Sequence, residues 1–273
     1  MKLLRATVLI LAFSIIVHTS EGQVLDFAGS RYQALADASV GLTGCWSAFG
    51  NQSGLAGCNH PEIAGAFQNR YLVSELSTRI GLLVIPVQST VVAFSLYQFG
   101  EVPFRQEKFG IAFARRIFPK LSFGLQFNYY RLFLAEANRS VGSAGLELGI
   151  QYLPGKKLNI GLHVLNPYQT SVKTYSEKYN YPSRINFGAG YHLSAAFLMV
   201  SEIEHDFAGH FRVKTGMEYS IMEKLYLRTG ILTNPYQLSS GIGFHIKKLA
   251  VDLGDSFHSN LGNSPSVTFN YHF

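Results

Sequence analysis

The stretch from residue 121 to residue 130, LSFGLQFNYY, decides the fold class of this chain. Its apolar and aromatic side chains alternate with smaller or polar ones, and fall at Leu121, Phe123, Leu125, Phe127 and Tyr129. A period of two places these side chains on one face of a β-strand. The same alternation recurs in residues 144–152, 185–191, 211–219 and 238–246. Segments of about ten residues with alternating hydrophobicity are typical of the strands of a transmembrane β-barrel.

Fourteen such segments follow one another from residue 62 onward. They span residues 62–71, 78–86, 88–98, 105–116, 120–134, 142–153, 157–165, 182–192, 195–205, 209–220, 224–232, 236–247, 248–256 and 265–273. Every second connection is tight, whereas the others include longer polar loops, such as residues 166–181 and 258–264. Short turns on one rim and longer loops on the other are typical of outer-membrane barrels. We therefore predict an all-β fold for residues 62–273, a closed antiparallel transmembrane β-barrel of about fourteen strands.

The alternation also predicts which face of each strand meets lipid. The apolar set should point outward and includes Phe123, Phe127, Phe187, Phe211, Met217 and Phe244. The opposite set should face the lumen and includes Gln126, Arg184, Arg212, Glu218 and Arg228. Charges in such number would be very costly in the apolar core of a soluble protein. In a wet or plugged lumen they can pair with one another and hydrate.

The composition and the first residues indicate export to a bacterial outer membrane. Only 15% of the 273 residues are charged, against roughly a quarter in ordinary soluble domains. Residues 1–22 read as a signal peptide, with Lys2 and Arg5 before an apolar run and small residues before a cleavage site at Gln23. The net charge of +6 is spread without a dense basic run. We therefore assign the basic residues to barrel rims that face anionic lipid and predict no binding of nucleic acid.

Residues 23–61 do not alternate and are predicted to form a plug. Residues 31–40 (RYQALADASV) can make a short helix, and a glycine-rich stretch follows in residues 41–57. A barrel of about fourteen strands encloses more space than its own side chains fill. We expect this N-terminal segment to lie at or inside the periplasmic mouth of the barrel.

Cys45 and Cys58, the only two cysteines, both fall in the plug segment. Two cysteines in an exported protein most often pair, so we predict a disulfide between them. A metal site formed by Cys45, Cys58 and His60 is the alternative, but it lacks an obvious fourth ligand. We predict no cofactor.

The last strand carries alternating aromatic residues to the end of the given sequence. Phe269, Tyr271 and Phe273 share one face of this strand. Such an ending resembles the signal that the outer-membrane barrel assembly machinery recognises. We interpret these three residues as that assembly signal, with the machinery as a partner during biogenesis.

The sequence offers little support for an enzyme. The stretch Gly50-Asn51-Gln52-Ser53-Gly54 is not a Gly-x-Ser-x-Gly nucleophile elbow. The nine histidines are scattered, and no group of Asp, Glu and His shows the spacing of metal ligands. We predict a non-enzymatic protein and leave an outer-membrane lipid-modifying enzyme as the least favoured alternative.

Two stretches resemble the beginning of the PorV/PorQ-type outer-membrane proteins. They are Gly29-Ser30-Arg31 with residues 34–40 (ALADASV), and residues 46–56 (WSAFGNQSGLA). Residues 71–78 (YLVSELST) continue the likeness. The second stretch commonly contains Asn-Pro-Ala-Gly-Leu in that family, whereas residues 51–55 here read NQSGL and lack the proline. The family is related to the FadL long-chain fatty-acid channels, which are fourteen-stranded barrels with an N-terminal plug.

This resemblance implies two functions. PorV-type members work with the type IX secretion system and bind secreted cargo or the translocon at the outer membrane. The resemblance thus implies an accessory or partner-binding component of a protein secretion system, surrounded by outer-membrane lipid. The alternative is a FadL-like channel for hydrophobic small molecules.

Overall fold

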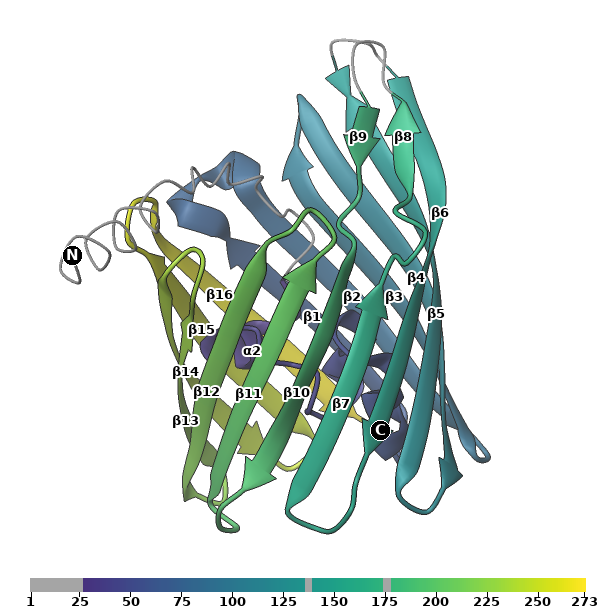
Figure 1. Cartoon of the computed structure of the whole chain (residues 1–273). Helices are drawn as coiled ribbons and strands as arrows, with labels where there is room; N and C mark the ends of the chain where they lie inside the picture. Colours follow the sequence, from purple (N-terminus) through teal and green to yellow (C-terminus); the bar gives the residue numbers. More distant parts are fainter. Residues whose placement is uncertain (1–26, 136–138, 174–177) are drawn as a thin grey trace, which may run out of the picture.

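The chain forms one closed antiparallel barrel of fourteen strands, which confirms the predicted fold class. The computed structural model describes residues 27–135, 139–173 and 178–273. The predicted signal peptide and its cleavage site lie outside the described residues. Each barrel strand pairs with the next barrel strand in the chain, β7 pairs directly with β10, and β1 closes the barrel against β16 (Figure 1).

The barrel strands lie within about two to four residues of the predicted segments. Their bounds are β1 (Glu62–Asn69), β2 (Ser77–Val87), β3 (Thr90–Glu101), β4 (Phe104–Phe118), β5 (Leu121–Leu134), β6 (Arg139–Tyr152), β7 (Leu158–Leu165), β10 (Arg184–His192), β11 (Phe197–Asp206), β12 (Phe211–Met222), β13 (Leu225–Leu232), β14 (Gln237–Ile246), β15 (Leu249–His258) and β16 (Gly262–His272). The short helical turns η3 (Arg70–Leu72) and η4 (Ser74–Leu76) connect β1 to β2.

The connection between β7 and β10 is more ordered than the polar loop that the sequence predicts. It contains a small hairpin of β8 (Ser171–Lys173) and β9 (Lys178–Asn180), which stands above the rim in Figure 1. Tyr181 stacks on Tyr130 of β5 with ring centroids 4.4 Å apart, and Tyr179 meets Tyr181 edge-on at 5.3 Å. These rings pack with Val172 in a second, small apolar core that fixes the hairpin.

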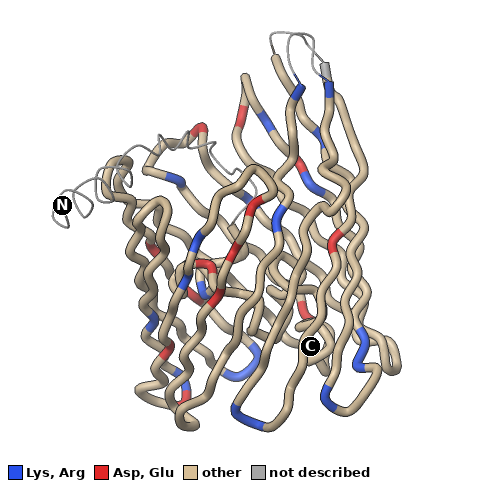
Figure 2. Tube along the Cα trace, in the orientation of Figure 1, with Lys and Arg blue, Asp and Glu red and all other residues tan. Residues whose placement is uncertain are grey.

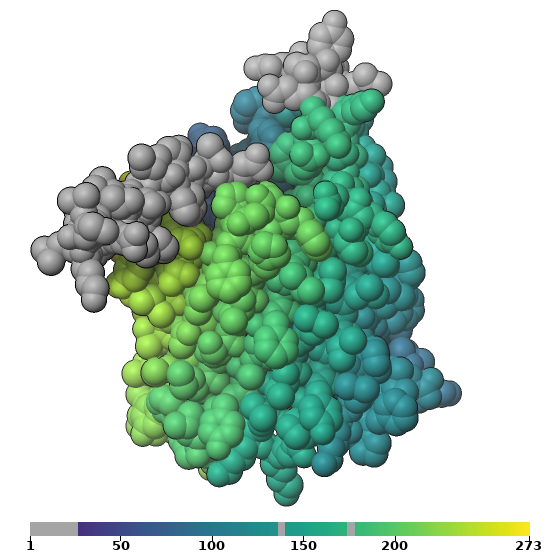
Figure 3. Space-filling view, viewed as in Figure 1, coloured from purple at the N-terminus to yellow at the C-terminus, as the bar shows by residue number. Residues whose placement is uncertain are grey.

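The outer surface of the barrel is apolar. Among the residues assigned to lipid, the exposed fractions run from 36% for Phe123 to 54% for Phe127 and Phe187. Figure 3 shows the outer face over β7 and β10–β13 as a closed wall of side chains. The closed ladder satisfies the backbone hydrogen bonds of the strands, as a hydrocarbon environment requires. Together these features place the barrel in a bacterial outer membrane.

The two rims of the barrel differ. The short-turn rim carries basic residues in its tight turns (Figure 2), namely Lys120, Lys156, Lys157, Lys224, Lys247 and Lys248. The opposite, long-loop rim carries η3, η4 and the β8–β9 hairpin. Short turns face the periplasm in outer-membrane barrels, so the long-loop rim faces outward from the cell. Among the described residues, no helix is long and apolar enough to cross a membrane.

The position of an outward phenylalanine along its strand should decide how well lysine is tolerated there. Phe127 lies in the middle of β5, whereas Phe118 is the last residue of β4 at the short-turn rim. We expect Phe127→Lys to lower the free energy of unfolding by about 2–4 kcal/mol, and the control Phe118→Lys by only about 0–1 kcal/mol. Urea unfolding in lipid vesicles measures both, and equal losses would contradict the assigned placement in the bilayer.

Candidate functional site: the plug and the lumenal cavity

The described part of the plug, residues 27–61, lies inside the barrel (Figure 1). It contains helix α2 (Ser30–Ala34) and two helical turns, η1 (Cys45–Phe49) and η2 (Gln52–Gly57). The helix is shorter than the predicted span of residues 31–40. Ala36 and Asp37 take left-handed φ values of 58° and 59°, so the chain turns away from the helix axis. This turn brings the following backbone to the wall at β11.

Eight inward-facing glycines make room for the plug. They form four cross-strand pairs: Gly124 with Gly149, Gly161 with Gly188, Gly216 with Gly230, and Gly241 with Gly254. A β-carbon at Gly216 would lie 2.8 Å from the Cα of Leu35, and one at Gly230 would lie 2.6 Å from the backbone N of Ala36. We call these eight residues the glycine belt. The belt lets the plug backbone approach the wall more closely than any larger residue would allow.

Side chains of the wall hold the irregular backbone of the plug. The carboxylate of Glu202 on β11 accepts the N–H groups of Ser39 at 2.8 Å and Val40 at 2.9 Å. The amide of Gln151 on β6 donates to the carbonyls of Val40 at 3.0 Å and Leu42 at 2.6 Å. Non-helical backbone at membrane depth is tolerated where the surrounding protein satisfies it. Polar lumenal side chains supply that satisfaction here.

A chain of ion pairs links the plug to three strands. Arg31 of α2 makes a two-point contact with Glu218 of β12, at 2.8 and 2.9 Å. Glu218 also binds Arg228 of β13 at 2.6 Å, and Arg228 binds Asp252 of β15 at 2.6 Å. The structure thus places the predicted lumenal residues Glu218 and Arg228 together at the plug. Loss of one partner would leave buried charge without compensation.

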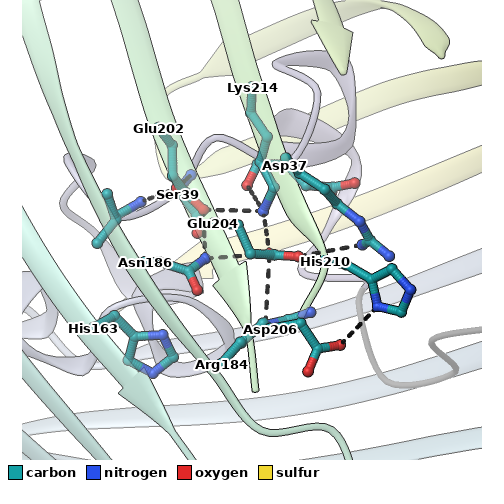
Figure 4. Close-up of polar contacts among 12 residues, drawn as sticks. Asp37, Ser39, His163, Arg184, Asn186, Glu202, Glu204, Asp206, His210 and Lys214 are labelled. Carbon is teal, nitrogen blue, oxygen red and sulfur yellow. Dashed lines mark hydrogen bonds and ion pairs between the residues drawn. The ribbon is translucent and has the colours of Figure 1, made fainter. Parts of the chain in front are cut away.

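A second cluster of charges centres on Glu204 of β11 (Figure 4). Its carboxylate lies 2.8 Å from the Lys214 ammonium, 3.2 Å from the Arg212 guanidinium and 3.6 Å from that of Arg184. The predicted lumenal residues Arg184 and Arg212 meet here. Lys214 also binds Glu202 at 2.9 Å, which joins this cluster to the plug anchor.

Gln126, the remaining predicted lumenal residue, belongs to a third cluster. It is fully buried and donates to Asn128 at 2.8 Å and to Glu147 at 3.3 Å. Glu147 also accepts a hydrogen bond from Gln52 of the plug at 2.7 Å, and pairs with Lys108 at 3.2 Å. The alternation of the sequence puts these residues on the inner face, but it carries no signal for which of them contact the plug. The sequence therefore assigns Glu147 and Glu202 to the inner face without identifying them as plug contacts, and it misses Glu204 altogether.

The plug lies between two cavities. The larger has a volume of about 600 Å³ on the long-loop side, and its lining includes Phe49, Leu76, Phe99, Phe104, Arg184, Asn186, Glu204, Arg212, Lys214, Leu232 and Leu261. We call it the long-loop cavity. The smaller, of about 230 Å³, lies toward the short-turn rim beside Cys45, Trp46, Glu62 and Asn270. Among the described residues, no group of three or more His, Cys, Asp and Glu side chains is placed to hold a metal ion.

Cys45 and Cys58 are free thiols, not the disulfide that the sequence predicts. Both are buried in the apolar core shared by the plug and the wall. The Cys45 sulfur accepts a hydrogen bond from Asn270 of β16 at 3.4 Å, which holds its side chain toward the wall. The prediction rested on the tendency of two cysteines in an exported protein to pair, and the stability of the plug does not depend on such a bond. The burial of the plug and its hydrogen bonds to the lumen supply that stability instead.

The predicted assembly-signal residues lie on the outer face at the short-turn rim. Phe269, Tyr271 and Phe273 are all exposed. Tyr271 stands opposite Ile63 where β16 pairs with β1, so these residues border the strand pair that closes the barrel. Phe273 donates its backbone N–H to the carbonyl of Pro61 at 3.0 Å, which ties the end of β16 to the end of the plug.

Comparison with solved structures agrees with this architecture. The Pseudomonas putida toluene transporter TodX matches with a TM-score of 0.70 at 10% identity, over 91% of this chain and 99% of that one. The Ralstonia pickettii toluene transporter TbuX matches with a TM-score of 0.66 at 11% identity, over 91% and 99%. A Pseudomonas aeruginosa FadL homologue matches with a TM-score of 0.66 at 11% identity, over 90% and 98%.

The fold is that of the FadL-type transport channels. No protein-family model matches the sequence, and no curated protein matches it either. At these identities the likeness concerns the fold alone. The PorV/PorQ resemblance of the plug segment therefore remains a sequence-based expectation.

The close approach of the plug to the glycine belt predicts that an added β-carbon in the belt disturbs the packing of the plug. Alanine at Gly216 would collide with Leu35, whereas alanine at Gly81 of β2 would have its nearest neighbour, the Leu96 side chain, at 3.9 Å. We expect Gly216→Ala to cost about 1–3 kcal/mol through overpacking and to make residues 27–61 sensitive to protease. The control Gly81→Ala should leave the plug protected. Resistance of the plug in both variants would contradict the close approach at the belt.

The state of the thiols predicts their reactivity. Burial, together with the negative charge of Glu62, raises the pKa of the Cys58 thiol to about 12, so little thiolate is present at mildly alkaline pH. We expect iodoacetamide to label Cys45 and Cys58 slowly in the folded protein and quickly after denaturation without reductant. Mass spectrometry counts the labels. A denatured chain that takes up label only after reduction would instead establish the disulfide.

Proposed function

We propose that this protein is an outer-membrane channel for hydrophobic small molecules. The observation that carries the proposal is the long-loop cavity of about 600 Å³, which lies between the outward-facing rim and the plug. Pockets of this size that are lined by aromatic and aliphatic side chains are typical sites for small molecules. The fold shared with two toluene transporters supports the same function.

The apolar lining comes from several elements that meet at the cavity. Leu76 ends η4, Phe99 and Phe104 lie on neighbouring strands, Phe49 comes from the plug, and Leu261 lies in the last long loop. A molecule that enters from the long-loop rim therefore exchanges water for apolar side chains before it reaches the plug. Passage to the periplasm then requires the plug to shift, because it separates the long-loop cavity from the smaller one.

The resemblance to PorV/PorQ-type proteins supports a second proposal, an accessory role in a type IX-like secretion system. It rests on residues 29–31, 34–40 and 46–56, which lie in the buried plug, and on residues 71–78, which lie at η3, η4 and the start of β2. Residues of a buried plug are poorly placed to contact secreted cargo or a translocon directly. The channel is therefore the better-supported of the two functions. Co-purification of the protein with components of a secretion system would instead favour the accessory role. Recognition of the exposed β16 aromatics by the barrel assembly machinery remains part of the proposal.

Uptake of toluene by cells that express the protein tests the channel. Leu261 is 54% exposed at the cavity mouth, and Leu193 is 49% exposed at the short-turn rim. We expect Leu261→Asp to lower the initial uptake rate by about threefold to tenfold, because a charge at the mouth disfavours an apolar solute. The control Leu193→Asp should leave uptake unchanged. Wild-type uptake no faster than that of cells without the protein would refute the channel.

A further inference from the structure

We infer that the long-loop cavity prefers a neutral amphiphile, an apolar body with one uncharged hydrogen-bonding head group, over a carboxylate of the same size. This inference rests on the proposed function and names its substrate class. Two features of the cavity carry it. The cavity is divided into an apolar and a polar wall, and every cation on the polar wall is in contact with a carboxylate.

The cavity has two chemically different walls. Phe99 of β3 and Phe104 of β4 line one side, together with Phe49 of the plug. The lysine, arginine and glutamate side chains that strands contribute to the lining come from β10, β11 and β12. In the order of the barrel, β5, β6 and β7 separate these groups on one side, and six strands separate them on the other. The two walls therefore face each other across the lumen.

The polar wall presents cations that are already paired. Glu204 contacts Lys214, Arg212 and Arg184, and it is 1% exposed. Glu202, also 1% exposed, supplies a second carboxylate to Lys214. Asp37 of the plug, which lines the same cavity and interacts electrostatically with Lys214, adds a third negative charge to these three cations. Figure 4 shows these side chains converging at one place, with Asn186 hydrogen-bonded to Glu202 at 2.5 Å. The other cation of the lining, Arg70, lies on η3 away from this wall, over the ring of Tyr71 at 5.8 Å.

The pairing of these cations with carboxylates determines which ligand head group the cavity prefers. A carboxylate that enters the cavity gives up its hydration, and burial of an ion is far more costly than burial of a hydroxyl. The carboxylate would recover the lost hydration free energy only by pairing with an uncompensated positive charge. At this wall, the negative charge of Glu204 would repel it. A hydroxyl or amide meets both donors and acceptors here and loses little. The apolar wall meanwhile receives the rest of the molecule.

Ligands with one chain and different heads provide the test. Purified protein in detergent is incubated with equal concentrations of n-decanol, n-decanoate or n-decane, and bound ligand is measured by native mass spectrometry. We expect n-decanol to bind the wild type more tightly than n-decanoate. Tighter or equal binding of n-decanoate would overturn the inference.

A charge-removing substitution tests the cause. Glu204→Gln keeps the size of the side chain and leaves cations of the wall less compensated, so n-decanoate should bind about tenfold more tightly than to the wild type. Binding of n-decanol should change little. The control is Glu107→Gln, because Glu107 also pairs with two arginines, Arg105 at 3.0 Å and Arg131 at 3.5 Å, but does not line the cavity. An unchanged ratio of the two ligands in Glu204→Gln would overturn the inference.

The outcomes also separate the inference from the proposed function. Binding of n-decane and n-decanol without discrimination against n-decanoate overturns the head-group preference and leaves the channel standing. If none of the three ligands binds the wild type, both the head-group preference and the proposed channel function are overturned. Heat-modifiable migration on gels verifies that each variant is folded, and the wild-type ranking decides the question even if Glu204→Gln does not fold.

Discussion

The structure depends on one constraint, namely that every backbone N–H and C=O at membrane depth needs a partner other than water. The fourteen strands meet it by closing the ladder between β1 and β16. The described plug backbone has no strand partner to bond with. Side chains on the inner face of the barrel provide its hydrogen-bond partners instead. Glu202 accepts two plug N–H groups, and Gln151 donates to two plug carbonyls. The polar inner face is thus a scaffold for irregular backbone as much as a lining of the lumen.

Such contacts require short distances, and the glycine belt provides them. A polar side chain of the wall can reach the plug backbone only if neighbouring positions leave the backbone room to approach. The pairing of glycines across adjacent strands, as at Gly216 and Gly230, clears a patch that a single glycine would not. The abundance of glycine in this chain therefore has a packing cause in addition to the flexibility of its turns.

The plug anchor and the polar wall of the long-loop cavity share one network. Lys214 binds Glu202, which holds the plug backbone, and Glu204, which faces the long-loop cavity. A change of charge at the cavity wall therefore alters the electrostatic surroundings of the plug anchor. In a low-dielectric lumen such coupling is stronger than it would be at a surface. The polar wall of the cavity and the anchor of the plug backbone are thus parts of one network of charges.

The sequence by itself determined the barrel, because a period of two over Leu121–Leu134 and the other strands leaves each strand one apolar face and one polar face. It also assigned residues 23–61 to a different structure, since they lack that period. It could not decide which inward residues contact the plug, because Gln126, Glu147 and Glu202 look alike in the pattern and differ only in what crosses the lumen beside them. The contacts that stabilise the plug come from strands far away in the chain, and only the closed tertiary structure brings them to it.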